Sequence, residues 1–208
     1  GAPGLEQHQR AIAAAVSAGV RHVVYTSIVH PEPGSPVLIA PDHYGTEGAL
    51  ESAGLGFTVL RNNLYADLLL MSLPRAVASG RLEAAAGTGG AAYVTREDCA
   101  RVAAAALASD FTGKRTLDVT GPEVVTYALL ASLATEVSGR PVSYVGLEPE
   151  AMRTRLVAGG MPAPVAELMV SFDLGLARGL FGPASRTVTE LTGHPPTSIL
   201  ELLENHRA

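Results

Sequence analysis

Polar side chains capable of binding a ligand follow two short apolar runs in this sequence. Thr26 and Ser27 end the first run, and Arg61, Asn62 and Asn63 follow the second. If both runs are parallel strands of an open α/β sheet, their carboxyl ends meet at one edge, where ligands bind in such folds. The alternative is ordinary loop capping, because Ser, Thr and Asn also favour turns. Two clusters at one edge favour the ligand site.

Two aromatic side chains are predicted to lie beside these strand ends. His43 opens the helix that connects the two strands, and a helix N-terminus disfavours the cationic imidazolium. We therefore expect either a neutral donor or acceptor, or an exposed surface histidine. Tyr65 begins the next helix, where it would wall a ring-shaped ligand or simply pack. Glu47 and Glu51 lie one helical turn apart, and a solvated face is a simpler interpretation than an acid/base pair.

Other chemistries have little support in the sequence. The six histidines show no metal-ligand spacing, and there is no G-x-S-x-G motif for an acyl-transfer serine. Cys99 lies in an alanine-rich stretch and is predicted to be buried rather than nucleophilic. The glycines of 87–90 are not followed by a helix start, so they predict a turn. The apolar stretch 161–181 would either line a substrate pocket or close a helical core.

Apolar periodicity, caps and glycine stops predict strands that alternate with helices, which is typical of parallel βαβ units. The fold class expected is α/β, a doubly wound core with a smaller α-rich lobe. Pro74 should bend or break its helix. The predicted strands are 20–25, 57–60, two short ones within 81–94, 115–121 and 141–147; the predicted helices are 4–18, 42–53 capped by Asp42, 64–79, 96–109 capped by Thr95, 127–139 capped by Thr126, and most of the chain after 148.

The composition excludes several classes of protein. Hydrophobic residues make up 47% of the chain and charged residues 17%, which suits a well-buried globular fold. The formal net charge is -5, without a basic cluster, which argues against nucleic acid as a partner. The single cysteine excludes an intramolecular disulfide and fits a reducing compartment. There is no membrane-spanning run and no secretory signal, so we expect a cytoplasmic protein.

Four longer segments and three local marks resemble a known family. The segments are 14–27, 51–65, 84–107 and 117–144; the local marks are His43 before Thr46-Glu47, Arg61-Asn62 with Tyr65, and SFDLGLARGLF at 171–181. Taken together, they resemble the NmrA-like branch of the atypical short-chain dehydrogenase/reductases. Within that branch, the chain is most similar to the type 2 NAD(P)H:quinone oxidoreductases.

The resemblance implies an NADPH-binding, Rossmann-like core, with a small quinone-like substrate between this core and the helical lobe. Either His43 or Tyr65 would be the catalytic donor to the developing oxyanion. A homodimer is also expected. The cofactor contacts carried over by position are Thr26, Ser27, His43, Arg61, Asn62 and Asn63.

The chain also departs from this family. Roughly the first 75 residues of the fold, with the initial strands and the glycine-rich loop, have no counterpart here. We therefore expect a truncated product in which 1–120 is the C-terminal part of the core and 121–208 is the helical lobe. The tyrosine-lysine pair of ordinary short-chain dehydrogenases is missing, because Gly48 stands four residues after Tyr44. The truncated chain could thus be inactive. The alternatives are a non-catalytic NADP-binding redox sensor and a structural remnant.

Overall fold

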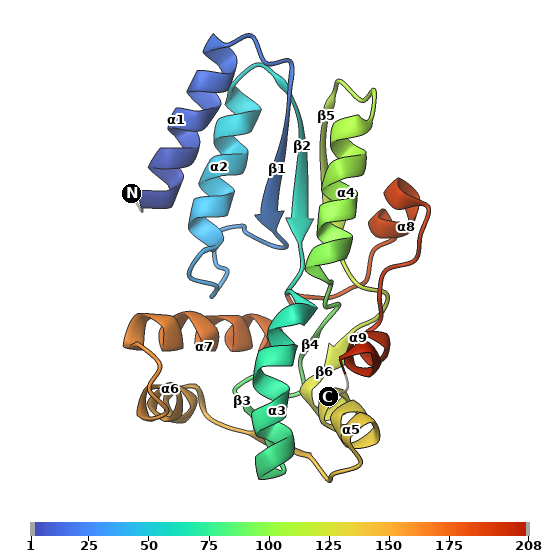
Figure 1. The fold of residues 1–208 in the computed structure, drawn as a ribbon. Coiled ribbons are helices and arrows are strands. Elements are labelled where there is room, and N and C mark those ends of the chain that lie inside the picture. The colour runs from blue at the N-terminus through green and yellow to red at the C-terminus, as the bar shows by residue number, and fades with distance from the viewer. Residues whose placement is uncertain (1–2, 207–208) are drawn as a thin grey trace.

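A three-stranded parallel sheet forms one half of the protein (Figure 1). The computed structural model describes residues 3–206, and its sheet has the order β1 (His22–Ile28), β2 (Gly56–Asn62) and β5 (Lys114–Val119). In the parallel register, Ser27 of β1 lies opposite Arg61 of β2. The predicted parallel α/β sheet is confirmed. The strands β1 and β2 are longer than predicted, because backbone pairing continues through their polar ends, whereas β5 ends two residues before the predicted end.

Helices cover both faces of this sheet. The helices α1 (Pro3–Ser17) and α2 (Ala40–Ser52) pack on one face, where Leu50 of α2 meets Val59 of β2. The helix α4 (Arg96–Ala108) lies on the other face, where Val102 contacts Leu60. Since neighbouring residues of a strand point to opposite faces, β2 contributes to both cores. The arrangement is doubly wound, as predicted.

The start of α2 differs from the prediction. Asp42 does not cap this helix; the N-cap residue is Ile39, which makes no side-chain capping bond. Pro41 instead occupies the first helical turn, where its missing N–H costs no hydrogen bond. The helix therefore begins three residues earlier than a capping Asp42 would place it, and His43 lies within its first turn.

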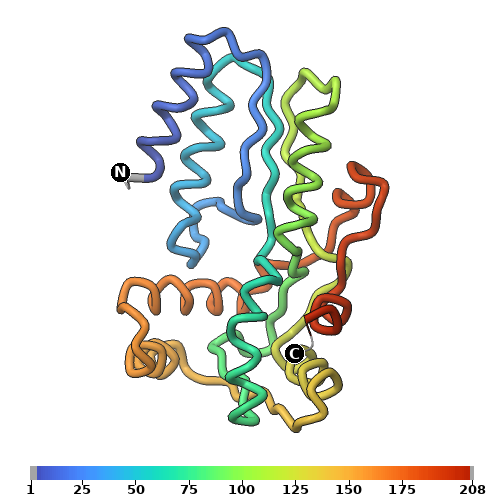
Figure 2. Tube along the Cα trace, viewed as in Figure 1, coloured from blue at the N-terminus to red at the C-terminus, as the bar shows by residue number. Residues whose placement is uncertain are grey.

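The second half of the protein is mostly helical, and the chain enters and leaves it several times (Figure 2). Its two small sheets pair β3 with β7 in parallel and β4 with β6 antiparallel. The elements outside the main sheet and its covering helices are η1 (Ala66–Leu68), α3 (Leu69–Ser79), β3 (Arg81–Ala84), β4 (Gly90–Ala91), β6 (Val125–Thr126), α5 (Tyr127–Ser138), β7 (Ser143–Gly146), α6 (Pro149–Ala158), α7 (Ala163–Ala177), α8 (Thr187–Thr192) and α9 (Ile199–Asn205). We call α3, α5, α6, α7, α9 and the small sheets the helical lobe.

Two local predictions in this lobe are refined by the structure. Pro74 does not end its helix: α3 runs through it, and the break comes earlier, at the 3-10 turn η1. The glycines of 87–90 form a turn, as predicted, which connects β3 to β4. A Cβ atom on Gly89 would lie 1.9 Å from the carbonyl oxygen of Leu176. This turn is therefore packed directly on the end of α7.

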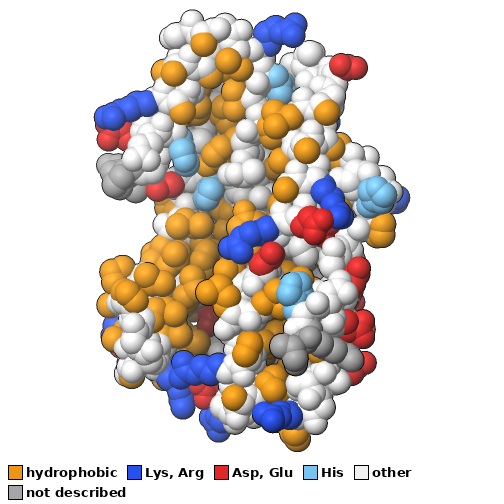
Figure 3. Space-filling view, in the orientation of Figure 1, with side chains coloured by type: hydrophobic (Ala, Val, Ile, Leu, Met, Phe, Trp, Pro, Cys, Tyr) orange, Lys and Arg blue, Asp and Glu red, His pale blue; other side chains and the backbone are white. Residues whose placement is uncertain are grey.

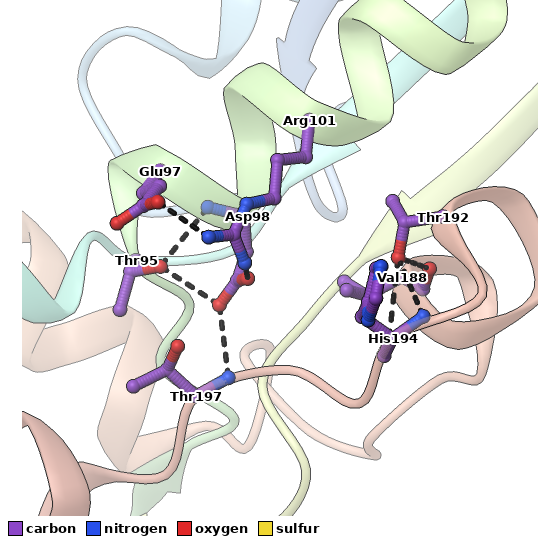
Figure 4. Close-up of polar contacts among 8 residues, drawn as sticks. All are labelled: Thr95, Glu97, Asp98, Arg101, Val188, Thr192, His194 and Thr197. Carbon is purple, nitrogen blue, oxygen red and sulfur yellow. Dashed lines mark hydrogen bonds and ion pairs between the residues drawn. The ribbon is translucent and has the colours of Figure 1, made fainter.

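The N-terminus of α4 holds the segment that leads to α9 (Figure 4). Thr95 caps α4 as predicted, since its Oγ1 accepts the Asp98 N–H at 3.0 Å. The Asp98 carboxylate accepts the Thr95 hydroxyl at 2.7 Å and the Thr197 backbone N–H at 2.9 Å. The cap thus also joins two distant parts of the chain.

Within residues 3–206, no helix is both long and apolar enough to cross a membrane.

Candidate active site

A cavity of about 450 Å³ lies between the carboxyl ends of β1 and β2 and the helical lobe. Thr26, Ser27 and Asn62 line it from the strands, and His43 lines it from α2. Figure 3 shows hydrophobic side chains gathered around the hollow between the two halves of the protein. This volume falls within the range of small-molecule sites, which are typically apolar with a few polar groups.

The polar side chains at the strand ends differ in whether they are exposed to the cavity or already hydrogen-bonded within the fold. Thr26 is exposed to the cavity, whereas Ser27 is buried and donates its hydroxyl proton to Glu47 at 2.6 Å. Asn63 is committed to the fold: its Nδ2 donates to the carbonyl of Phe181 at 2.8 Å, and its Oδ1 accepts the Leu64 N–H at 2.7 Å. Asn63 therefore ties the end of β2 to the helical lobe.

Asn62 and Tyr65 form a linked pair in the cavity wall. The Asn62 Nδ2 donates to the Tyr65 hydroxyl oxygen at 3.3 Å, which leaves the tyrosine proton available to another acceptor. The Asn62 side chain is only 4% exposed, and its Oδ1 has no hydrogen-bond partner among the residues described. A buried acceptor without a donor is costly, so it points to a ligand donor at this position.

Arg61 is not among the residues that line the cavity. Its Nη2 and Nε donate to Glu47 at 2.7 and 3.1 Å, and its Nη1 donates to Glu32 at 2.7 Å. The prediction of a solvated Glu47 was wrong, because this side chain is 14% exposed and contacts Arg61 and Ser27. Glu51, which is 64% exposed and paired with Lys114, is solvated as predicted. The Arg61–Glu47 pair fixes α2 against the sheet.

His43 is half-buried and is hydrogen-bonded to Tyr25, a residue that sequence reasoning missed. The two side chains meet at His43 Nδ1, 2.8 Å from the Tyr25 hydroxyl oxygen. Burial lowers the pKa of His43, with the nearby His8 adding to the effect, so the ring is neutral at pH 7. A neutral ring that accepts the Tyr25 proton at Nδ1 carries its own proton at Nε2. The neutral form was expected, and burial is its main cause.

The helical lobe contributes the apolar wall. Three of the chain's four methionines, Met152, Met161 and Met169, line the cavity, and Phe172 lies beside them. Methionine side chains are flexible and polarisable, so such a wall can adapt to aromatic ligands of different shape. The stretch 161–181 therefore lines the cavity and also contributes to the core of the lobe.

Asp173 is a cavity residue that sequence reasoning also missed. It lies on α7, is 6% exposed, and accepts the Ala85 N–H at 2.7 Å. A signal was available: Asp173 lies three residues from both Val170 and Leu176, which are apolar and buried. Positions three apart share one face of a helix, so this aspartate had to point inward.

Two other chemistries find no support in the described structure. Cys99 is buried, as predicted, and burial together with the carboxylates of Asp98 and Asp67 raises its pKa to about 12. Its thiol is therefore not ionised at pH 7. Within residues 3–206, no group of three or more His, Cys, Asp or Glu side chains is arranged to hold a metal ion.

Comparison with known proteins identifies the family. Quinone oxidoreductase 2 of Escherichia coli strain K12 is 34% identical over 195 residues, which are 94% of this chain and 68% of that protein. The chain belongs to the quinone oxidoreductase 2 family. The resemblance to NmrA-like reductases is thereby confirmed. No family model matches the chain.

Two solved structures agree with this assignment. The Escherichia coli enzyme complexed with NADPH superimposes with a TM-score of 0.90 at 34% identity, covering 96% of this chain and 70% of that one. The Citrobacter sp. triphenylmethane reductase complexed with NADP(H) gives a TM-score of 0.90 at 29% identity, with coverages of 99% and 73%. The chain thus spans about 70% of the length of these relatives.

Proposed function

We propose that this protein is an NADPH-dependent reductase that transfers a hydride to quinones or similar electron-poor aromatics. The observation that carries the proposal is the cavity at the carboxyl ends of β1 and β2, where a few polar groups face an apolar, methionine-rich wall. Hydride transfer needs close positioning of two rings and a donor for the negative charge that develops on oxygen. The relatives with known activity support the same reaction class.

The residues present fit the nicotinamide end of NADPH. Asn62 Oδ1 is a buried acceptor without a partner among residues 3–206, and a carboxamide N–H would satisfy it. Thr26 and Ser27 would border the ribose, and His43 and Asn63 line the same cavity. Arg61 acts through its pairing with Glu47, and its direct contact with cofactor remains a prediction. When bound, NADPH supplies the hydride.

The chain's own contribution is to stabilise charge on the substrate. In the tautomer in which Nδ1 accepts the Tyr25 proton, neutral His43 carries a proton at Nε2 that it can donate to a quinone oxygen as negative charge develops there. Tyr65 can do the same, because its hydroxyl accepts from Asn62 and keeps its own proton to donate. These two residues are the proposed catalytic donors. The apolar lobe wall excludes water, which strengthens both hydrogen bonds.

The test is NADPH oxidation by the purified chain with a panel of quinones, next to NADPH binding measured by cofactor fluorescence. We expect turnover that falls about a hundredfold in His43→Ala. The matched control is His194→Ala, which removes an exposed histidine outside the cavity. Binding without turnover would contradict the reductase and favour an NADP-binding regulator. Unchanged quinone turnover in His43→Ala would remove His43 from its role.

A homodimer and a cytoplasmic location remain predictions, the first testable by light scattering.

A further inference from the structure

A buried carboxyl group lies in the substrate cavity and has no role in the reaction as described so far. Asp173 is on α7, in the lobe wall, and its side chain is 6% exposed. Its Oδ2 accepts the Ala85 N–H at 2.7 Å, and the Tyr127 hydroxyl is close enough to the carboxyl to lower its pKa. Both groups are neutral. Among the described residues, none of the ion pairs involves this carboxylate.

Quinone reduction needs a proton, and neither His43 nor Tyr65 is a strong acid. Addition of a hydride to a neutral quinone gives a hydroquinone anion, and one proton on its oxygen completes the neutral hydroquinone. A neutral imidazole is a very weak acid, so full transfer from it is unfavourable at pH 7, and a tyrosine phenol is only about as acidic as the hydroquinone that it would protonate. A carboxylic acid releases its proton far more readily.

We propose that Asp173 is the general acid of this reaction: its carboxyl proton passes to the oxygen of the reduced quinone, and the resulting carboxylate is reprotonated from water. The step balances, because NADPH, quinone and one proton give NADP⁺ and hydroquinone. The inference rests on the proposed reductase function and extends it. It assigns the proton to a named residue on the lobe side of the cavity, whereas the oxyanion donors come from the sheet side.

The surroundings of Asp173 keep a proton on it at accessible pH. Burial raises the pKa of Asp173 to about 6, against the smaller opposing effects of the hydrogen bonds from Ala85 and Tyr127. A bound substrate would exclude water and raise it further, because desolvation disfavours the charged form. The groups that face Asp173 or share its cavity are Tyr65, Tyr93, Tyr127, Tyr144, His43, and Glu83, which pairs with Arg81 and Arg155.

The decisive experiment compares two acceptors that differ in their need for a proton. Menadione, a quinone, needs one proton per hydride. Malachite green, a cationic triphenylmethane dye, becomes neutral on accepting a hydride and needs none. In Asp173→Asn, whose side chain keeps an oxygen for the Ala85 N–H, we expect kcat for menadione to fall about a hundredfold. At saturating dye, kcat for malachite green should stay within about twofold of the wild-type value.

The matched control is Asp67→Asn. Asp67 also accepts a backbone N–H, from Arg96 at 2.8 Å, but it does not line the cavity. Both acceptors should be reduced by this variant at wild-type rates. Equal losses on both acceptors in Asp173→Asn, or no loss on either, would overturn the inference. If the wild type oxidised NADPH with neither acceptor, the proposed function itself would fail. This outcome differs from a loss of activity that is seen only in Asp173→Asn.

A second variant and a measurement that does not depend on turnover distinguish a general acid from a residue that only supports the structure. Tyr127→Phe removes a hydrogen bond that lowers the Asp173 pKa, so the inflection near pH 6 in kcat for menadione should move upward. Infrared difference spectra of the resting protein should show a protonated carboxyl band that titrates near pH 6 and is absent in Asp173→Asn. A band that persists in Asp173→Asn, or an unmoved inflection in Tyr127→Phe, would contradict the assignment.

Discussion

Two carboxylates near the cavity, the partly buried Glu47 on the sheet side and the buried Asp173 on the lobe side, have different partners. Glu47, behind the ends of β1 and β2, accepts two hydrogen bonds from the Arg61 guanidinium and one from Ser27. Asp173, in the lobe wall, accepts from the backbone N–H of Ala85 and lies near the Tyr127 hydroxyl. The first carboxylate has a cationic partner and the second has none. The comparison suggests a division of roles: the ion pair holds α2 and the sheet in register, and the uncompensated carboxyl can exchange a proton.

The strongest test of this comparison is to remove the cation on the sheet side. Arg61→Met should lower the free energy of unfolding by about 3 kcal/mol, because it leaves the partly buried Glu47 without its charged partner. Urea denaturation at pH 7 measures the loss. The control Arg10→Met breaks an exposed pair with Glu6 and should cost less than about 1 kcal/mol. Equal losses in the two variants would show that Glu47 needs no compensation.

On the lobe side, the free energy of unfolding should fall as the pH rises, because Asp173 loses its proton. Asp173 has a folded pKa of about 6, above its ordinary value of 3.8, so the folded state holds its proton more tightly than the unfolded state does. Its contribution is therefore fully present below pH 4 and is lost as the pH rises through 6. Relative to Asp173→Asn, the wild type should lose on the order of 2 kcal/mol between pH 4 and pH 7. Urea denaturation across this range measures the difference. Parallel stability curves for the two proteins would contradict the prediction.

A smaller effect is expected from the residue that orients His43. Tyr25→Phe removes the hydrogen bond at Nδ1, and kcat for quinones should fall about tenfold, the equivalent of one hydrogen bond. Because a hydrogen bond donated to the neutral ring favours the neutral form, its loss should also raise the pKa of His43. Steady-state kinetics and an NMR titration of the histidines check the two effects. An unchanged kcat would mean that Tyr25 does not position the ring.

The smallest effect should come from the apolar part of the lobe wall. Met169→Leu conserves volume, so the stability should change by less than about 1 kcal/mol. A branched leucine adapts less well than methionine, and turnover of bulky acceptors should fall about threefold relative to menadione. A panel of quinones of increasing size measures this ratio. If the ratio stays constant, the flexibility of the methionine wall has no part in substrate choice.

The residues on the two sides of the cavity could not be predicted equally well from the sequence. Thr26, Ser27 and Asn62 could be assigned to one edge because strand periodicity and the rule for parallel sheets are local arguments. The caps Thr95 and Thr126 were likewise found from short patterns, and both accept the expected backbone N–H. Local signals therefore predicted that Thr26, Ser27 and Asn62 lie at one edge of the sheet, and their contacts with the cofactor stay predictions.

The remaining site residues depend on tertiary packing. Arg61 and Glu47 lie on different elements, and no short pattern indicates that α2 turns this glutamate toward the sheet. Asp173 meets Ala85 and Tyr127 only because α7, the end of β3 and α5 come together in the lobe. The capping role predicted for Asp42 failed for a related reason: Pro41 fits the first helical turn and shifts the start of α2. The spacing of residues in a sequence does not show which of two possible helix starts is the more stable.

The repeated crossings of the chain between the two halves limit how the protein can be cut or recombined. After β2 the chain enters the helical lobe, returns in α4, leaves again after β5, and comes back as α8, which packs on α4 beside β5, before it ends in α9. A single proteolytic cut between the halves would therefore release neither of them. A chimaera that exchanges the lobe for that of a relative must join the two parents at every crossing, and the cavity has to be inherited as a noncontiguous unit.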